Sequence, residues 1–158
     1  MLKILEIDNK KELETLRKVS KKVNEKDIKD PLFQQFLDDL IYTAQNTVTE
    51  EGWEAAGLAA VQVGKLIKVF CILRDSKEFE IMINPEIKEI TKDTAIDTEA
   101  CLSIPHQTGN VERFKKIKVT YLDRNGNKKR ERFSNWEARE IQHEYDHLEG
   151  VLFTDKLV

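Results

Sequence analysis

The segment that most constrains this fold is His143-Glu144-Tyr145-Asp146-His147, a H-E-x-x-H pattern in a chain with only three histidines. On an α-helix, residues four apart share one face, so both imidazoles can bind a single divalent metal ion. Glu144 follows the first histidine, where its carboxylate can accept a proton from metal-bound water. The pattern therefore predicts a helix that carries a metal site. The competing interpretation is a helix with two solvated histidines.

The residues around this pattern favour the metal site. Ser134 and Glu137 predict a capping box at the start of the helix, and Gly150 predicts a left-handed residue after its end. At about 100° per residue, one side of the helix carries a stripe made of Trp136, Glu140, His143 and His147. The other side carries Ile141, Tyr145 and Leu148. A helix with ligands on one side and large apolar groups on the other is expected to be buried on both.

Length, charge and cysteine content narrow the class of protein. A chain of 158 residues predicts one domain, spanning residues 1–158, that needs no disulfide. The net charge of −3, with both signs interleaved, favours neither nucleic acid nor a membrane as partner. No apolar run approaches the roughly 20 residues of a membrane span, and the first residues lack a secretory apolar core. We expect a cytoplasmic protein with reduced thiols at Cys71 and Cys101.

The remaining patterns predict an α+β domain. Asp30-Pro31 is a helix start, and apolar residues at helical spacing continue to about Thr49. Strands are expected over 67–73, over 79–83 before Asn84-Pro85, over 117–122 and over 128–133. Asn125-Gly126 predicts a hairpin turn between the last two. The expected fold therefore has mostly antiparallel β-sheets around a buried C-terminal metal-binding helix, together with an N-terminal helix.

A catalytic metal site needs a third protein ligand and one open position. From the residues alone the third ligand is Cys101, His106 or one of many carboxylates. Cys101 lies in a segment, 99–105, without a strong helical or strand period, and a thiolate there is a strong ligand for a borderline-soft cation. Cys71 lies in an apolar strand pattern and is better interpreted as a small buried hydrophobe.

Three segments resemble the motifs of the peptide deformylase family, and they occur in the family's order. Gly57–Gln62 (GLAAVQ) resembles G-x-G-x-A-A-x-Q, Glu99–Ser103 (EACLS) resembles E-G-C-L-S, and Gln142–His147 (QHEYDH) resembles Q-H-E-x-D-H. Each motif alone is only suggestive, but three in order are highly specific. The similarity covers nearly the whole chain.

The resemblance implies an enzyme that removes the formyl group from the formyl-methionine of newly made proteins. It implies three metal ligands: Cys101, His143 and His147. Glu144 is expected to transfer the proton, while the Gln62 side chain and the Leu102 N–H are expected to hold the developing oxyanion. Ferrous iron is the metal expected in cells, with zinc, nickel or cobalt as alternatives.

The resemblance also predicts how substrate is held. The partners are N-formylmethionyl peptides of nascent chains, bound in extended form along the backbone of Ala56, Gly57 and Ala100. The methionine side chain is expected in an apolar pocket beside the final helix. Gly57 is there for close backbone approach or is a simple turn glycine. We expect a monomer that comes transiently near the ribosome. The chain ends soon after the motif helix, without the C-terminal docking helix of longer members.

Three positions depart from the family pattern. Ala55 and Ala100 replace glycines, which either strains a left-handed backbone or narrows the cleft. Glu140 stands on the ligand side of the helix, where a small or apolar residue is expected at the methionine pocket. It turns to solvent, pairs with a cation such as Arg139 or Lys129, or changes the preference for the first side chain.

Two other functions compete with an active deformylase. One is a zincin-type peptidase that uses the same H-E-x-x-H pattern, although such enzymes need neither Cys101 nor Gln62. The other is a non-catalytic relative that keeps peptide or metal affinity, or a deformylase with altered substrate preference. Against loss of activity, every residue that the resemblance places in the chemistry is present. Arg113 either pairs with Glu99 beside Cys101 or is a surface arginine.

Overall fold

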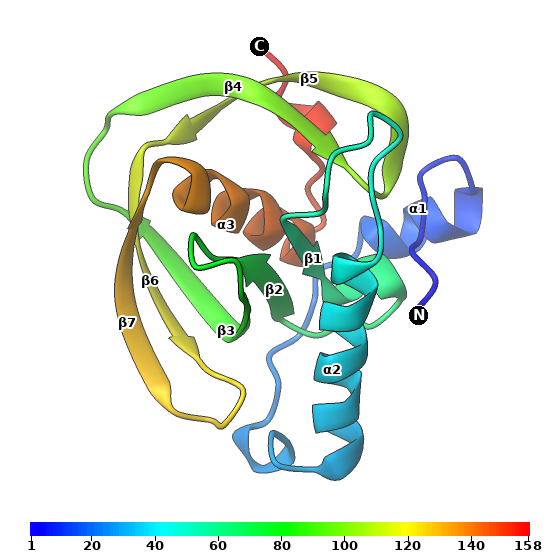
Figure 1. The fold of residues 1–158 in the computed structure, drawn as a ribbon, viewed down its shortest axis with the longest axis vertical. Coiled ribbons are helices and arrows are strands. Elements are labelled where there is room, and N and C mark those ends of the chain that lie inside the picture. The colour runs from blue at the N-terminus through cyan, green and yellow to red at the C-terminus, as the bar shows by residue number, and fades with distance from the viewer.

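A central helix enclosed by two β-sheets is the main feature of the computed structural model, which describes all residues 1–158 (Figure 1). The helices are α1 (Lys10–Leu16), α2 (Pro31–Gln45) and α3 (Asn135–Leu148). The strands are β1 (Gly57–Ala59), β2 (Val69–Leu73), β3 (Phe79–Glu89), β4 (Thr94–Cys101), β5 (Ile104–Phe114), β6 (Lys116–Leu122) and β7 (Lys128–Ser134). Five strands form one antiparallel sheet in the order β1-β2-β3-β6-β7, and β4 pairs with β5 in a separate ribbon. The expected α+β class is confirmed.

Helix α3 is buried on both sides, as its sequence pattern predicts. Ile141 and Leu148 pack with Phe70 and Val119 against the inner face of the five-stranded sheet. The β4–β5 ribbon arches over the other side (Figure 1). Each fully buried aliphatic or aromatic side chain stabilises the fold by about 1.5–3 kcal/mol. Gly150 has φ of 74° and follows the C-terminal cap of α3, which confirms the predicted helix end.

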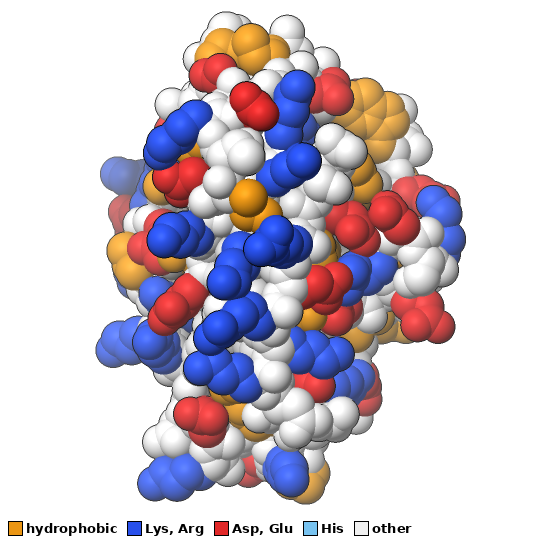
Figure 2. All heavy atoms as spheres, turned by 90° about the vertical axis from the view of Figure 1, so that its left-hand side faces the viewer, with side chains coloured by type: hydrophobic (Ala, Val, Ile, Leu, Met, Phe, Trp, Pro, Cys, Tyr) orange, Lys and Arg blue, Asp and Glu red, His pale blue; other side chains and the backbone are white.

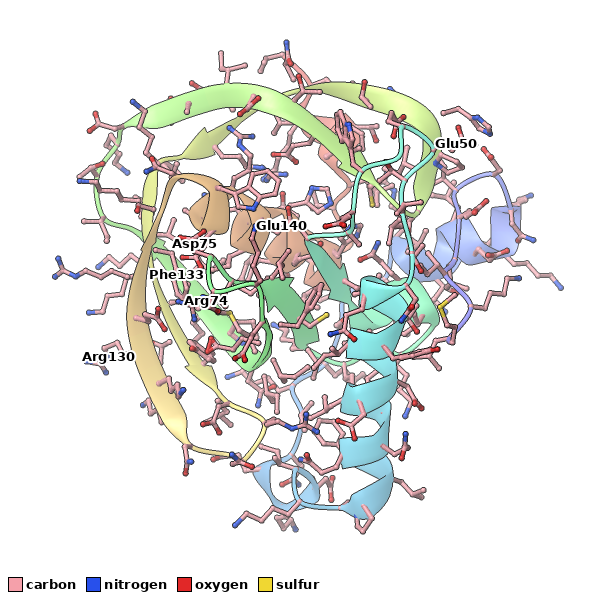
Figure 3. The ribbon with its side chains drawn as sticks, viewed as in Figure 1. Glu50, Arg74, Asp75, Arg130, Phe133 and Glu140 are labelled. Atoms are coloured by element: carbon pink, nitrogen blue, oxygen red, sulfur yellow. The ribbon has the colours of Figure 1, made fainter.

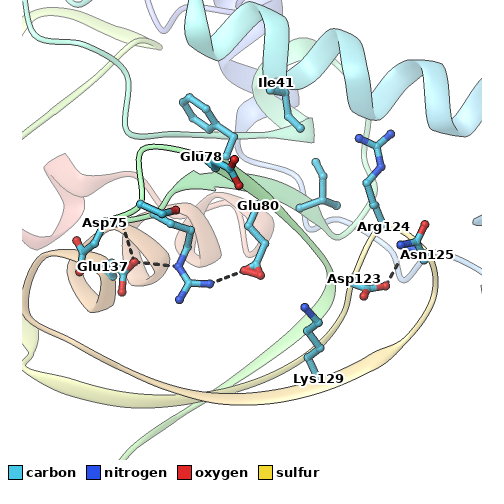
Figure 4. A pocket seen from close by; sticks show the side chains of 13 residues that line it. Ile41, Asp75, Glu78, Glu80, Asp123, Arg124, Asn125, Lys129 and Glu137 are labelled. Atoms are coloured by element: carbon cyan, nitrogen blue, oxygen red, sulfur yellow. Dashed lines mark hydrogen bonds and ion pairs between the residues drawn. The ribbon is translucent and has the colours of Figure 1, made fainter.

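The predicted capping box of α3 is wrong. Ser134 occupies the N-cap position, but its side chain accepts no hydrogen bond from the helix. Glu137 instead accepts a hydrogen bond from Arg74 Nε at 2.9 Å and one from the Asp75 N–H at 3.0 Å (Figure 4). An ion pair with a guanidinium is a stronger interaction than a second cap bond, so Glu137 turns away from the helix start.

Helix α2 begins as predicted and ends early. The Asp30 side chain accepts a hydrogen bond from the Leu32 N–H at 2.8 Å, and Pro31 is the first helical residue. The helix ends at Gln45, not near Thr49. Asn46 and Thr47 donate side-chain hydrogen bonds to carbonyls four residues back, an alternative to continued helix. No helix of the structure is long and apolar enough to cross a membrane.

The predicted strands are present, with one correction. The β6–β7 hairpin turns at Gly126, whose φ is 85°. Strand β3 does not stop at Asn84-Pro85 but continues to Glu89. The pairing with β6 shifts register between Ile83 and Glu86, and this bulge accommodates the proline without loss of the ladder beyond it.

The β4–β5 ribbon was not predicted. Most positions of β4 and β5 are exposed or half-buried, and the two buried positions of β4 are Glu99 and Cys101, so hydrophobic alternation is weak. The ribbon nevertheless carries Glu99 and Cys101 to the ligand side of α3. It is therefore the element that completes the candidate site.

Candidate metal centre and cleft

Three buried side chains converge between α3 and the end of β4. Potential ligand atoms of Cys101, His143 and His147 all lie within 4.8 Å of one another. The two histidines are one helical turn apart, and Cys101 Sγ lies 3.4 Å from His147 Nε2. His106, the other histidine considered as a ligand, lies on the surface and pairs with Glu50 at 2.7 Å. Among the sequence candidates, the structure thus brings Cys101 to the two histidines.

The chemistry of this donor set fits a divalent metal ion. His143 Nδ1 lies 2.8 Å from Glu99 Oε1, an arrangement that orients the ring and leaves Nε2 for a ligand bond. Burial alone would raise the pKa of Cys101, but His147 and His143 lower it to about 5, so the thiolate is favoured. Cys71 is fully buried in β2, and burial raises the pKa of its thiol. This agrees with its interpretation as a core residue.

Glu99 is the charged residue that organises the site from behind. Its carboxylate binds the Arg113 guanidinium through two bonds of 2.9 Å and accepts a third from Arg139 Nη1 at 2.6 Å. Burial opposes its ionised form, but Arg113 and His143 lower the pKa of this carboxyl well below its ordinary value. The predicted pair of Arg113 with Glu99 is confirmed. The contribution of Arg139 was missed, because residues 40 apart in sequence give no local signal.

Glu144 lies beside the ligand group with an oxygen that has no partner. Its side chain is almost fully buried, and Oε2 forms no hydrogen bond. Burial, and then the nearby Glu140 and Cys101, raise its pKa well above the ordinary value, against the opposing effect of His143. A carboxyl group with a raised pKa beside a metal-binding group is suited to proton transfer.

Gln62 is held in one orientation by its neighbours. Its Oε1 accepts from the Ala59 N–H at 2.9 Å, and its Nε2 donates to Ser103 Oγ at 3.1 Å and points toward Cys101 Sγ at 3.5 Å. The Leu102 N–H, in the turn after β4, forms no hydrogen bond within the protein. Gln62 and Leu102 both line the cleft in front of the ligand group.

A cleft of about 490 Å³ opens in front of these groups, between β1, β4 and α3. Its lining includes all the residues that the sequence predicted for substrate binding: Ala56, Gly57, Ala100 and Glu140. Trp53 and Trp136, both half-exposed, also line the cleft. Strand β1 is an edge of the five-stranded sheet and β4 is an edge of its ribbon, so both have an unpaired side.

Glu140 faces this cleft and has no cationic partner. It forms no ion pair with Arg139, which binds Glu99, or with Lys129, which lines a different cavity. Figure 3 labels it on α3, beside the cleft. A Cβ atom built on Gly57 would lie 3.0 Å from Glu140 Oε1 and 2.9 Å from Glu144 Cγ. Gly57 is therefore a close-approach glycine within a strand, not a turn glycine.

The alanines that replace family glycines cause no backbone strain. Neither Ala55 nor Ala100 has a positive φ angle. Both line the cleft, where their methyl groups take up space that a glycine would leave open. Of the two explanations considered, the structure supports the narrower cleft.

The fold and this site together define a class: metal-dependent hydrolases with a Cys/His/His ligand group and an adjacent glutamate. Comparison with known proteins gives the family. The sequence model of the polypeptide deformylase family matches residues 1–158, and the chain belongs to this family. Its members are hydrolases that remove formyl groups from peptides. The competing zincin and binding-module interpretations are not favoured.

Individual relatives agree with this assignment. A peptide deformylase of Finegoldia magna is 38% identical over 144 residues, which cover 90% of this chain and 83% of the relative. The crystal structure of peptide deformylase from Thermotoga maritima is 33% identical, with a TM-score of 0.85 and coverage of 100% of this chain and 98% of that one. A Met-Ala-Ser-bound class I type b peptide deformylase from Acinetobacter baumannii is 27% identical, with a TM-score of 0.86 and coverage of 99% and 98%.

Proposed function

We propose that this chain hydrolyses the N-formyl group of formyl-methionyl peptides in the cleft between β1 and β4, with Cys101, His143 and His147 as ligands of one divalent metal ion. The observation that carries this proposal is the buried Cys/His/His group next to the unpartnered Glu144 carboxyl. When bound, the cation acts as a Lewis acid and makes water nucleophilic at neutral pH. Positive charge at this position also favours the ionised form of Glu144.

The chain's own groups then carry out the proton transfers. Glu144 accepts a proton from water at a carboxylate oxygen while the water oxygen forms a bond to the formyl carbon. The Gln62 Nε2–H and Leu102 N–H donate to the negative charge that develops on the formyl oxygen. Glu144 returns the proton to the peptide nitrogen as the carbon–nitrogen bond breaks. Formate and a free amino terminus are the products.

The substrate peptide is proposed to lie extended along the unpaired edges of β1 and β4. Backbone groups of Ala56, Gly57 and Ala100 would pair with it, as in β-strand addition. The Met-Ala-Ser peptide bound by the Acinetobacter baumannii relative supports a substrate of this length. The first side chain would lie beside Glu140 on α3, so this carboxylate is expected to influence the choice of that side chain.

We propose that ferrous iron is the metal bound in cells. We also propose that the protein acts in the cytoplasm, where nascent chains are made. A thiolate and two imidazoles suit iron, zinc, nickel and cobalt, so availability decides. A ferrous site with an open position is oxygen-sensitive. Protein purified without oxygen should therefore contain iron by mass spectrometry and lose activity in air. An air-stable iron preparation would contradict this assignment.

The activity itself is tested by formate release from formyl-Met-Ala-Ser, with acetyl-Met-Ala-Ser as the control peptide. Cys101→Ala should lose both the metal and turnover, whereas Cys71→Ala, which removes the other thiol, should keep both. Equal cleavage of formyl and acetyl peptides, or internal peptide cleavage, would point to another hydrolase. Full turnover by Cys101→Ala would contradict the assignment of Cys101 as a metal ligand.

A further inference from the structure

One row of basic side chains crosses three strands on the part of the outer sheet face that β3, β6 and β7 form. In the row that pairs β3, β6 and β7, Lys88 lies opposite Lys118, and Lys118 lies opposite Arg132. In the two neighbouring rows only β7 contributes a basic residue. Arg130 lies opposite Thr120, which lies opposite Glu86, and Lys128 lies opposite Leu122. Like charges directly opposite each other in a sheet are destabilising, so this arrangement is not explained by folding.

Strand alternation separates these charges from the acidic side chains. Along β7, Lys128, Arg130 and Arg132 are exposed, while Glu131 turns inward to Arg74 and Phe133 is buried. Arg130 points away from the body of the molecule, and Phe133 lies inside the sheet (Figure 3). The whole-chain charge of −3 therefore hides a face of opposite sign.

The basic side chains of this face are not paired with carboxylates. The outward basic side chains are Lys88, Lys116, Lys118, Lys128, Arg130 and Arg132, and none of them forms an ion pair. One acidic residue, Glu86, lies next to these basic residues on β3, and it pairs with Lys22 at 3.8 Å. Figure 2, which shows this side of the molecule, has a nearly continuous band of Lys and Arg side chains down its centre. We call these six residues the basic face.

We propose that the basic face is a docking surface for the phosphate backbone of structured RNA. Its charges repeat at about 4.8 Å between strands and about 6.7 Å along a strand, a density that suits closely spaced phosphates. The choice of RNA rests on the proposed function, because a nascent peptide is presented by an RNA-rich particle. Helix α3 and the cleft lie on the inner side of the sheet, so RNA on the outer side leaves the cleft accessible.

The composition of the basic face argues against two other partners. No large exposed hydrophobic side chain belongs to β3, β6 or β7, so the face lacks the apolar anchor of a membrane-surface element. It also lacks exposed aromatic rings on which single-stranded bases would stack. Contacts to the backbone of a folded RNA, without base readout, are what remain.

The test measures binding of a fluorescent RNA duplex of about 20 base pairs by the metal-loaded protein in 50 mM salt. Lys118→Ser, Arg130→Ser and Arg132→Ser are combined in one variant. The control variant combines Lys10→Ser, Lys26→Ser and Lys29→Ser, which changes the net charge equally at exposed positions elsewhere. Formate release from formyl-Met-Ala-Ser serves as the folding check, because none of these residues lies in the cleft.

We expect wild-type affinity to fall roughly 10²–10³-fold between 50 and 200 mM salt. The basic-face variant should bind at least about tenfold more weakly at 50 mM, with a salt slope lower by about 2–3, while the control variant resembles the wild type. Equal loss in both variants, no binding by wild type, or stronger binding to phosphatidylserine vesicles than to RNA would overturn the proposal. RNA binding is measured without turnover, so its failure is distinct from failure of the proposed function.

Discussion

Two charged clusters in this molecule have opposite charges at their centres and differ in burial. One is a carboxylate, Glu99, that is surrounded by Arg113, Arg139 and His143. The other is a guanidinium, Arg74, that is surrounded by Glu80, Glu131 and Glu137. The Glu99 side chain is 5% exposed, whereas that of Arg74 is 22% exposed and borders a cavity of about 570 Å³ (Figure 4).

This difference decides what each cluster does. Water cannot compensate a charge at Glu99, so its four-group network has one low-energy arrangement, and His143 is held in one orientation toward the ligand group. Water reaches the Arg74 cluster, where the ion pairs fasten the β2–β3 turn to β7 and α3. The buried cluster orients a functional group, while the accessible one connects elements.

Breaking the buried cluster should have the largest effect on stability. Glu99→Gln leaves two buried guanidinium groups without their shared carboxylate, although Arg113 keeps Asp146 at 2.6 Å. We expect the metal-free protein to lose about 3–5 kcal/mol of unfolding free energy. Urea denaturation in the presence of a chelator measures this. A loss below 1 kcal/mol would show that the cluster is not a stabilising network.

The same change should weaken metal binding. Without the Glu99 carboxylate, His143 loses the partner at Nδ1 that orients its ring. Loss of such a partner costs about 10–100-fold in metal affinity. Competition with a chromophoric chelator gives the affinity of wild type, Glu99→Gln and Arg74→Ala. We expect Arg74→Ala to bind metal like the wild type, and equal weakening in both variants would contradict an orienting role of Glu99.

Removing Arg74 should destabilise the fold less. Arg74→Ala leaves three partly exposed carboxylates near one another and loses contact with the Phe133 ring, whose centre lies 4.9 Å from the guanidinium carbon. We expect a loss of about 1–3 kcal/mol, because water solvates the remaining charges. Deformylation should remain near the wild-type rate. If Arg74→Ala destabilised the protein as much as Glu99→Gln, burial would not explain the difference between the two clusters.

Lowering the pH should have a smaller effect on the unfolding free energy, through the carboxyl group of Glu99. The folded-state pKa of Glu99 lies below its ordinary value of 4.5, so its contribution to stability is complete above about pH 4.5. That contribution is lost as pH falls toward the folded-state pKa, with a slope of at most about 1.4 kcal/mol per pH unit for one proton. Unfolding free energies of metal-free wild type and Glu99→Gln between pH 5 and 3 should converge. Parallel curves would exclude Glu99 as the titrating group.

Local patterns in the sequence predict the parts of this structure that are determined locally. The spacing around His143 and His147 and the end signal at Gly150 predict α3, and Asn125-Gly126 predicts the β6–β7 hairpin. The β4–β5 ribbon was not predicted, because few of its positions are buried and the buried ones include the charged Glu99 and Arg113. The ion pair of Glu137 with Arg74 was not predicted either. The capping box and Arg74 compete for the Glu137 carboxylate, and only the folded structure shows which interaction forms.

The same limit applies to the site. The resemblance to family motifs predicts the residues around Cys101 and Glu144 as site residues, and the structure places them together. Arg139 reaches Glu99 across 40 residues, a contact that no local period reveals. The basic face is also hidden in the sequence, because β7 alternates inward and outward charges that a whole-chain count averages.

The most direct test of the central claim compares Glu144→Gln with Glu140→Gln in metal-loaded protein. Both changes neutralise one carboxylate on the same side of α3, one helical turn apart, and only Glu144 is proposed to carry the proton. Formate release from formyl-Met-Ala-Ser is measured with metal content checked in each sample. We expect Glu144→Gln to bind metal and lose about 10²–10⁴-fold in kcat, while Glu140→Gln keeps turnover within about tenfold. Turnover by Glu144→Gln at the wild-type rate would contradict the account.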